Sequence, residues 1–127
     1  MEYLRIDSTL KTPDIDFDAQ KGILKITGRA IPENPEEFFS DMIQWVKDYF
    51  NSPKELTTVE IQLEYINSGS SKFILDFLHL LQDMHNSGKK CKVNWYYEED
   101  DEAVYELGKY YQSILKLPFE LIELYTT

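Results

Sequence analysis

One run of small polar residues in the sequence suits phosphate chemistry, the segment Asn67-Ser68-Gly69-Ser70-Ser71. It lies between a stretch that alternates like a strand and a stretch with helical periodicity. The free N–H groups and the dipole of a helix start would favour an anion there. The simpler interpretation is a helix cap made by Ser70 or Ser71, with Gly69 as a turn residue. Because neither a Gly-Lys-Ser/Thr triplet nor a Gly-x-Ser-x-Gly elbow is present, a P-loop and a hydrolase elbow are not predicted.

The histidines and the cysteine offer little chemistry. His79 and His85 are the only histidines, and on one helix they point about 240° apart, so they cannot share a metal ion. Cys91 is expected to be a small apolar residue, although Lys90 and Lys92 beside it would lower the pKa of its thiol. We therefore predict no metal site, no cofactor and no catalytic residue.

An acidic run, Glu98-Glu99-Asp100-Asp101-Glu102, is the most unusual local feature. It lacks the alternating acids, central glycine and distal glutamate of a calcium-binding loop. Acidic residues are stabilised at a helix N-terminus, so the first interpretation is a solvated first turn. The alternative is a recognition surface for a basic partner, with aromatic anchors supplied by the preceding residues 95–97.

Composition limits the class of protein. The chain has 127 residues, of which 43% are hydrophobic, which predicts one compact domain over 1–127. The formal net charge of −10 argues against nucleic acid or an anionic membrane as a partner. No apolar stretch approaches the roughly 20 residues needed to span a bilayer, and residues 1–10 do not resemble a secretory signal. With a single cysteine as well, which cannot form an internal disulfide, we expect a soluble cytoplasmic protein.

Strands alternate with helices along the sequence, which predicts an α/β layered domain with a mixed sheet. A helix is expected over 35–51, with Asn34 as its N-cap, Pro35 at its first position and Glu37 completing a capping-box pattern. A second helix is expected over 72–86, ending at Ser87-Gly88, and a third from the acidic run to about residue 113. The predicted strands are 3–7, 14–17, 22–28, 57–66, 89–97 and 119–125.

Three segments together carry a resemblance, namely IPENPEEFFSDMIQWV, LEYINSGSSKFILDFLHLL and VNWYYEEDDEAVYELG. They resemble the SiaC family of bacterial regulatory phosphoproteins, whose fold is similar to that of the STAS-domain anti-sigma-factor antagonists. The likeness covers nearly the whole chain. It implies a single STAS-like domain, a mixed β-sheet with helices packed mainly on one face, and no catalytic activity.

The resemblance also implies a phosphorylation switch. The family phosphosite follows an Asn at the end of a strand, which places it on Ser68, with Ser70 and Ser71 as alternatives; Gly69 departs from the expected pattern. A histidine-kinase-like serine/threonine kinase and a metal-dependent phosphatase are the implied modifying partners. The unmodified protein would bind and activate a diguanylate cyclase, raising cyclic di-GMP and favouring biofilm formation.

Phosphorylation would add about −1.5 to −2 charge at a helix start, where the fold can hold it. A partner that buries the unmodified hydroxyl would then have to dehydrate a dianion. We expect Lys72 to balance part of that charge. The predicted partner-binding residues are Asn67, Gly69, Lys72, Asp76 and His79. Two other functions use the same turn: an anion- or nucleotide-binding module, and a small hydrolase that uses Ser68 or Ser70.

Overall fold

The computed structural model describes residues 3–125, so residues 1–2 and 126–127 of the predicted domain lie outside the described part. Within that part, the chain forms one sheet and three helices. The elements in order are β1 (Leu4–Ile6), β2 (Asp14–Asp18), β3 (Ile23–Ala30), α1 (Pro35–Tyr49), β4 (Thr57–Ile66), α2 (Ser68–Asn86), β5 (Cys91–Glu98), α3 (Glu102–Ile114) and β6 (Phe119–Leu124).

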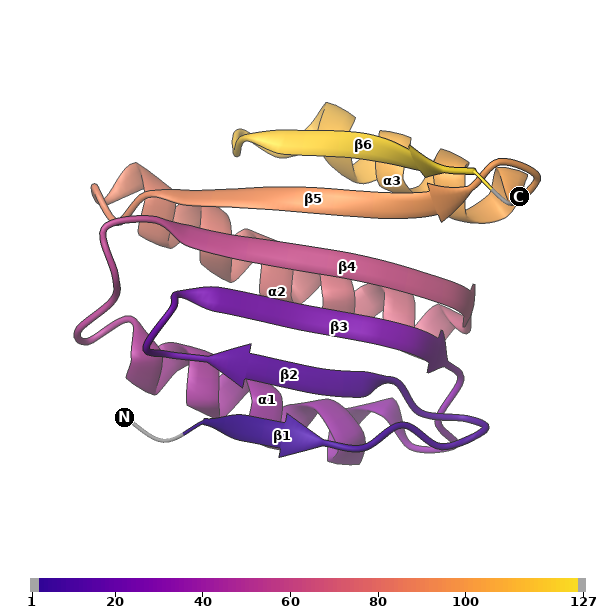
Figure 1. Ribbon diagram of the computed structural model, residues 1–127, viewed down its shortest axis with the longest axis horizontal. Helices are drawn as coiled ribbons and strands as arrows, with labels where there is room; N and C mark the ends of the chain where they lie inside the picture. Colours follow the sequence, from indigo (N-terminus) through magenta and orange to yellow (C-terminus); the bar gives the residue numbers. More distant parts are fainter. Residues whose placement is uncertain (1–2, 126–127) are drawn as a thin grey trace.

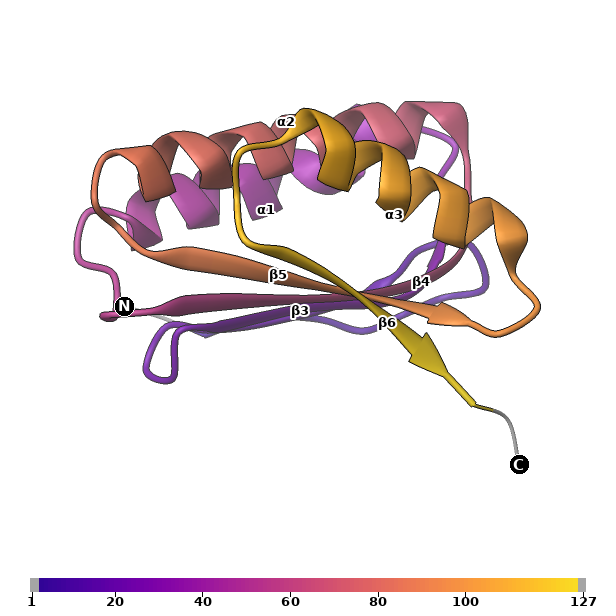
Figure 2. The same ribbon diagram turned by 90° about the horizontal axis from the view of Figure 1, so that it is seen from above.

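The sheet is mixed and its strand order follows the sequence, β1-β2-β3-β4-β5-β6 (Figure 1). The first three strands pair antiparallel, whereas β3, β4, β5 and β6 pair parallel through the helical crossovers. Because the order never reverses and such crossovers are right-handed, all three helices fall on one face (Figure 2). The predicted α/β fold, with a mixed sheet and helices on one face, is confirmed.

The core lies between the helices and that face of the sheet. Alternate strand residues point into it, as the period of two requires. Leu24 and Ile26 of β3 and Val59 and Ile61 of β4 are fully buried there, and so is Trp95 of β5. From the other side, α1 and α2 contribute buried side chains at helical spacing, namely Phe39, Met42, Val46, Ile74, Phe77, Leu78 and Leu81.

Side-chain caps fix where the helices begin. Asn34 caps α1 as predicted, accepting the N–H of Glu37 at 3.2 Å. The start of α2 differs from the prediction of residue 72, because Asn67 caps it by accepting the N–H of Ser70 at 2.9 Å. Asn is among the best N-cap residues, and the predicted serine caps are wrong. The serine segment is therefore the first turn of α2 rather than a loop.

The ends of four other elements also differ from the prediction. Asp101 caps α3 by accepting the N–H of Val104 at 3.1 Å, so only Glu102 of the acidic run lies in the helix. Glu98 belongs to β5, and the interpretation of the whole run as a first turn is wrong. The first helix ends at Tyr49 rather than at residue 51, and the last strand ends at Leu124.

The parallel strands bring the helix starts together. The C-terminal ends of β3, β4, β5 and β6 lie at one end of the sheet, and α1, α2 and α3 begin at that end (Figures 1 and 2). We call it the carboxyl end of the sheet. In many open α/β sheets the carboxyl ends of the strands are where ligands bind. Among residues 3–125, no helix has the length and apolar character that a bilayer crossing requires.

Candidate functional site

The first turn of α2 is anchored to neighbouring elements at the carboxyl end of the sheet. The Nδ2 atom of Asn67 donates to the carbonyl of Pro32 at 3.0 Å, and its backbone N–H donates to the carbonyl of Ala30 at 3.0 Å. From α3, the hydroxyl of Tyr111 donates to the carbonyl of Ser71 at 2.7 Å. Burial raises the pKa of Tyr111, so its phenol stays protonated as a donor.

The three serines of this turn have different environments. Ser68, at the first helical position, is exposed. Ser70 is 0% exposed, and its hydroxyl has no hydrogen-bond partner among the described residues. Ser71 is half-buried and donates its hydroxyl to the carbonyl of Ser68 at 2.9 Å. Ser68 is therefore the most exposed serine of the turn, whereas the hydroxyl of Ser71 is engaged in a hydrogen bond and that of Ser70 is enclosed.

Gly69 allows α2 to pack closely against the start of α1. A Cβ atom added there would lie 2.7 Å from Cγ of Pro35. The ring of Pro35 is closed onto its own backbone and cannot rotate away. The departure from the expected family pattern at this position thus has a packing reason.

Replacing Gly69 by alanine is expected to lower the free energy of unfolding by roughly 1 kcal/mol. The overlap with Pro35 should outweigh the better helix propensity of alanine. Urea unfolding would measure the change, and Lys72→Ala on an exposed position of the same helix is the matched control, expected within about 0.5 kcal/mol of the parent. A Gly69→Ala protein more stable than the parent would contradict this packing argument.

The other predicted partner-binding residues lie along α2. Lys72, Asp76 and His79 are all exposed. Their spacing of four and three residues places them on one side of the helix. His79 lies 11 positions beyond Ser68, about 16 Å along the helix axis at 1.5 Å per residue. That distance separates it from the serine hydroxyl, so it cannot act as the base that the hydrolase alternative needs.

His85 and Cys91 have structural roles. The backbone N–H of Cys91 donates to Nδ1 of His85 at 3.1 Å. The thiol is buried, and burial raises its pKa to about 11. The expectation that the flanking lysines lower this pKa is wrong, because loss of hydration dominates. Within residues 3–125, no group of three metal-ligating side chains comes together.

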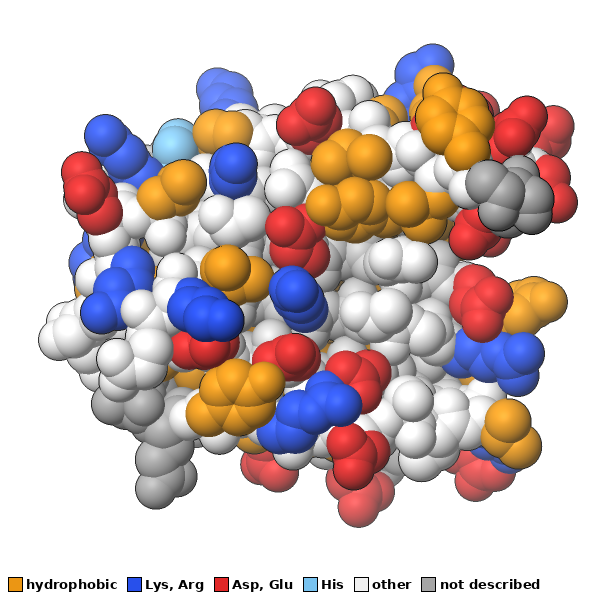
Figure 3. All heavy atoms as spheres, viewed as in Figure 1, with side chains coloured by type: hydrophobic (Ala, Val, Ile, Leu, Met, Phe, Trp, Pro, Cys, Tyr) orange, Lys and Arg blue, Asp and Glu red, His pale blue; other side chains and the backbone are white. Residues whose placement is uncertain are grey.

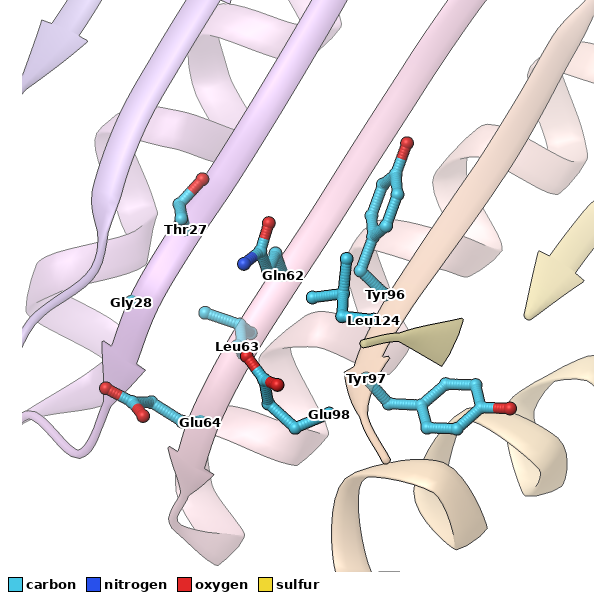
Figure 4. A pocket seen from close by; sticks show the side chains of 9 residues that line it. All are labelled: Thr27, Gly28, Gln62, Leu63, Glu64, Tyr96, Tyr97, Glu98 and Leu124. Carbon is cyan, nitrogen blue, oxygen red and sulfur yellow. The ribbon is translucent and has the colours of Figure 1, made fainter. Parts of the chain in front are cut away.

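The face of the sheet without helices carries a polar hollow of about 280 Å³. Thr27, Gln62 and Glu98 reach into it from three neighbouring strands (Figure 4). A hydrogen bond to the carboxylate of Glu60 is the main reason that the pKa of Tyr96, on the same face, is raised to about 12. Basic and acidic side chains are interspersed over this face (Figure 3). The hollow is lined by hydroxyl, amide and carboxylate groups.

A second hollow, of about 330 Å³, lies at the carboxyl end of the sheet. Its lining residues are Tyr65, Ile66, Asp101, Ala103, Val104 and Leu107. Sequence reasoning does not identify Tyr65 as a surface residue, because alternation along β4 predicts an inward side chain at this position. In the structure the tyrosine is 62% exposed. A register shift in the pairing of β3 with β4 sets this orientation, and no local sequence signal marks it.

Comparisons with known proteins find relatives over nearly the whole chain. The family model described as SiaC family regulatory phosphoprotein matches residues 6–124. An uncharacterised protein of Pseudomonas aeruginosa is 32% identical over 121 residues, covering 95% of this chain and 96% of that protein. The solved structure of SiaC from Pseudomonas aeruginosa is 30% identical with a TM-score of 0.91, covering 98% of this chain and 100% of its own.

A further solved structure is described as diguanylate cyclase SiaD in complex with its activator SiaC, also from Pseudomonas aeruginosa. Its matching chain is 31% identical to this one with a TM-score of 0.90, and the match covers 95% of this chain and 99% of that chain. The family model and the relatives each span nearly the whole chain and agree with the observed topology. The chain therefore belongs to the SiaC family of regulatory phosphoproteins.

Proposed function

We propose that this chain is a regulator without catalysis of its own, whose unmodified form binds and activates a diguanylate cyclase and whose phosphorylation on Ser68 ends that binding. The observation that carries the proposal is the exposure of Ser68, beside buried Ser70, at the first position of α2. The structure of a SiaC relative described as the activator of a diguanylate cyclase supports the choice of partner.

The fold is suited to tolerate a phosphate at Ser68. The N-terminal end of a helix carries a partial positive charge, which stabilises an anion in the first turn. Lys72 lies one turn further on and is exposed, so its ammonium group can approach the phosphate. Phosphorylation should therefore weaken partner binding, because burying a dianion without a matching cation costs several kcal/mol.

The same surface would serve the modifying enzymes, for which we propose a histidine-kinase-like serine/threonine kinase and a metal-dependent phosphatase. Lys72, Asp76 and His79 form its exposed side along α2, with Asn67 at its end. Gly69 has no side chain and packs against Pro35, so only its backbone can contribute to this surface. Phosphorylation requires a nucleoside triphosphate donor, which favours the cytoplasm as the proposed compartment.

Phosphopeptide mapping of the protein isolated from its native cells tests the proposal, with the peptide containing residues 67–72 as the target. We expect phosphate on Ser68. The unmodified and phosphorylated forms are then compared for binding to the diguanylate cyclase of the same cells, where only the unmodified form should bind. Equal binding of both forms, or phosphate confined to another segment, would overturn the proposal.

A further inference from the structure

Tyr65 is held in an unfavourable backbone conformation directly before the phosphorylatable turn. Its φ is +55°, and no other non-glycine residue between 3 and 125 has a positive φ. This left-handed region is disfavoured for residues with a Cβ atom. Arg29 pairs with Glu64 and Ala30 with Ile66, so Tyr65 is the extra residue of a β-bulge. Bulges of this kind redirect a side chain and are frequent beside functional sites.

The bulge turns a large aromatic ring outward beside an apolar hollow. Tyr65 is 62% exposed, and the guanidinium of Arg29 lies 5.3 Å from its ring centroid. Val104 and Leu107 of α3 line the adjoining hollow of about 330 Å³. We call Tyr65, Ile66, Ala103, Val104 and Leu107 the Tyr65 pocket. An exposed aromatic side chain next to a pocket is the arrangement that dominates binding energy at protein interfaces.

This pocket lies at the same end of the sheet as the proposed switch. Ile66 lines it, and Ser68 follows two residues later at the same end of the sheet. Both the start of α2 and the start of α3 lie at that end (Figure 2). A protein that covers Ser68 can therefore also contact the pocket at this end of the sheet.

The charge around the pocket indicates what it binds. Asp101 lines it, and the exposed residues Glu99, Asp100 and Glu102 surround the start of α3. We call these four residues the acidic rim. The guanidinium of Arg29 is 3.5 Å from a carboxylate oxygen of Glu64, so this cation is already paired. The surroundings of the pocket thus carry unbalanced negative charge.

We propose that the Tyr65 pocket and the acidic rim form a docking surface for a partner segment in which one large apolar side chain is flanked by arginine or lysine residues. The inference rests on the proposed function, and it assigns this segment to the cyclase. The apolar side chain fills the pocket on the side of β4, next to Ser68. The basic residues pair with the rim on the side of α3, away from the position that a phosphate would occupy.

The separation between the apolar contact near Ser68 and the basic contacts at the acidic rim explains how a phosphate on Ser68 can oppose binding of a basic segment. The unmodified Ser68 hydroxyl is covered by the apolar part of the segment, where a dianion would have to lose its hydration. The attraction between the basic residues of the segment and the acidic rim becomes weaker as the salt concentration rises, because exposed charges are screened. Binding should therefore weaken steadily with ionic strength, in addition to its dependence on phosphorylation.

The variant Tyr65→Asn separates folding from docking. Asparagine tolerates a positive φ better than tyrosine does, so the melting temperature should stay equal or rise. Affinity for the cyclase should fall by about 30-fold, the loss typical of an interface anchor. Tyr110→Ala, at an exposed tyrosine of α3 outside the pocket, is the matched control and should bind normally. Normal affinity of a well-folded Tyr65→Asn protein would overturn the proposal.

The charge requirement has its own variant. The double substitution Glu99→Lys with Asp100→Lys should weaken binding about tenfold and flatten its salt dependence. Glu55→Lys, at an exposed position in the connection from α1 to β4, is the control and should change neither property. An unchanged salt dependence of the double variant would remove the acidic rim from the proposal.

A peptide probe tests the surface even if the cyclase is not the partner. The capped peptide Arg-Arg-Phe-Arg-Arg is titrated into the full chain, with backbone amide NMR shifts as the readout, and Gln-Gln-Phe-Gln-Gln as the uncharged comparison. The largest shifts are expected at residues 65–66 and 103–107, absent with the glutamine peptide and in Tyr65→Asn. Peptide-induced shifts at other residues would overturn the docking surface. If these shifts are present but the parent protein does not bind the cyclase, only the proposed function is overturned.

Discussion

Replacing Gly108 by alanine is expected to lower the free energy of unfolding by about 2 to 3 kcal/mol, within the range for overpacked cores. Gly108 is a buried residue of α3 that packs directly on the indole of Trp95. An added Cβ would overlap with Cδ1 and Nε1 of that ring and lie 2.9 Å from Cδ2 of Leu121. Helix propensity alone predicts the opposite sign, with alanine more stable by about 1 kcal/mol.

The ring of Trp95 has no room to move away. It is 0% exposed, and its Nε1 donates to the carbonyl of Val104 at 3.0 Å. Tyr111 packs edge-on against it with centroids 5.6 Å apart, and the ring of Phe119 lies 6.1 Å away. The helix must therefore shift outward, which opens the interface between α3 and the sheet.

Urea or thermal unfolding would measure the effect, and Glu106→Ala on the exposed side of α3 serves as the control for helix propensity. A double-mutant cycle with Trp95→Leu sharpens the test. Leucine has no ring and no atom at the position of Nε1, so the Gly108→Ala penalty should shrink in that background. A penalty of the same size in both backgrounds would show that the indole is not its cause.

The position of α3 matters for function as well as for stability. This helix provides the Tyr111 hydroxyl that holds the carbonyl of Ser71. It also provides Val104 and Leu107 of the Tyr65 pocket. A helix displaced by Gly108→Ala should therefore loosen the first turn of α2 and weaken partner binding in addition to lowering stability.

Most of the fold could be predicted from the sequence, because the local patterns and the tertiary structure agree. The alternation along 57–66 sets the buried face of β4, and Asn34-Pro35 fixes the start of α1. The sequence predicts a start of α2 that is too late, because Ser70 and Ser71 are themselves acceptable N-cap residues. Local propensity does not decide between them and Asn67. Only the anchoring of Asn67 to Pro32 and Ala30 selects it.

The candidate site could be predicted only in outline. A resemblance identified the turn, and the structure added which serine is exposed. Ser70 is buried, and Gly69 beside it packs against Pro35 of α1, which is a contact between residues far apart in sequence. The outward orientation of Tyr65 depends on a register shift between two parallel strands. Neither property is carried by a local sequence pattern.

Ser68→Asp is expected to weaken the affinity for the cyclase about 100-fold, whereas Ser68→Ala should bind within about threefold of the unmodified parent. The reason for the loss is that a carboxylate in a covered interface must give up its hydration without gaining a cation. The fold should not be affected, because an acidic residue in the first turn is stabilised by the helix dipole by about 0.3 to 1 kcal/mol. A melting temperature equal to or above that of the parent would therefore accompany the loss of binding.

Ser52→Asp is the matched control, since Ser52 is exposed and lies in the connection from α1 to β4, at the end of the sheet opposite to α2's first turn (Figure 1). It introduces the same charge and should bind the cyclase normally, which separates a local effect from a change in net charge. Titration calorimetry measures both affinities. If Ser68→Asp binds like the parent while the kinase still switches Ser68→Ala, then Ser71 becomes the site to test. Ser70 would not be a candidate, because its hydroxyl is enclosed and a phosphate there would require the first turn of α2 to unfold.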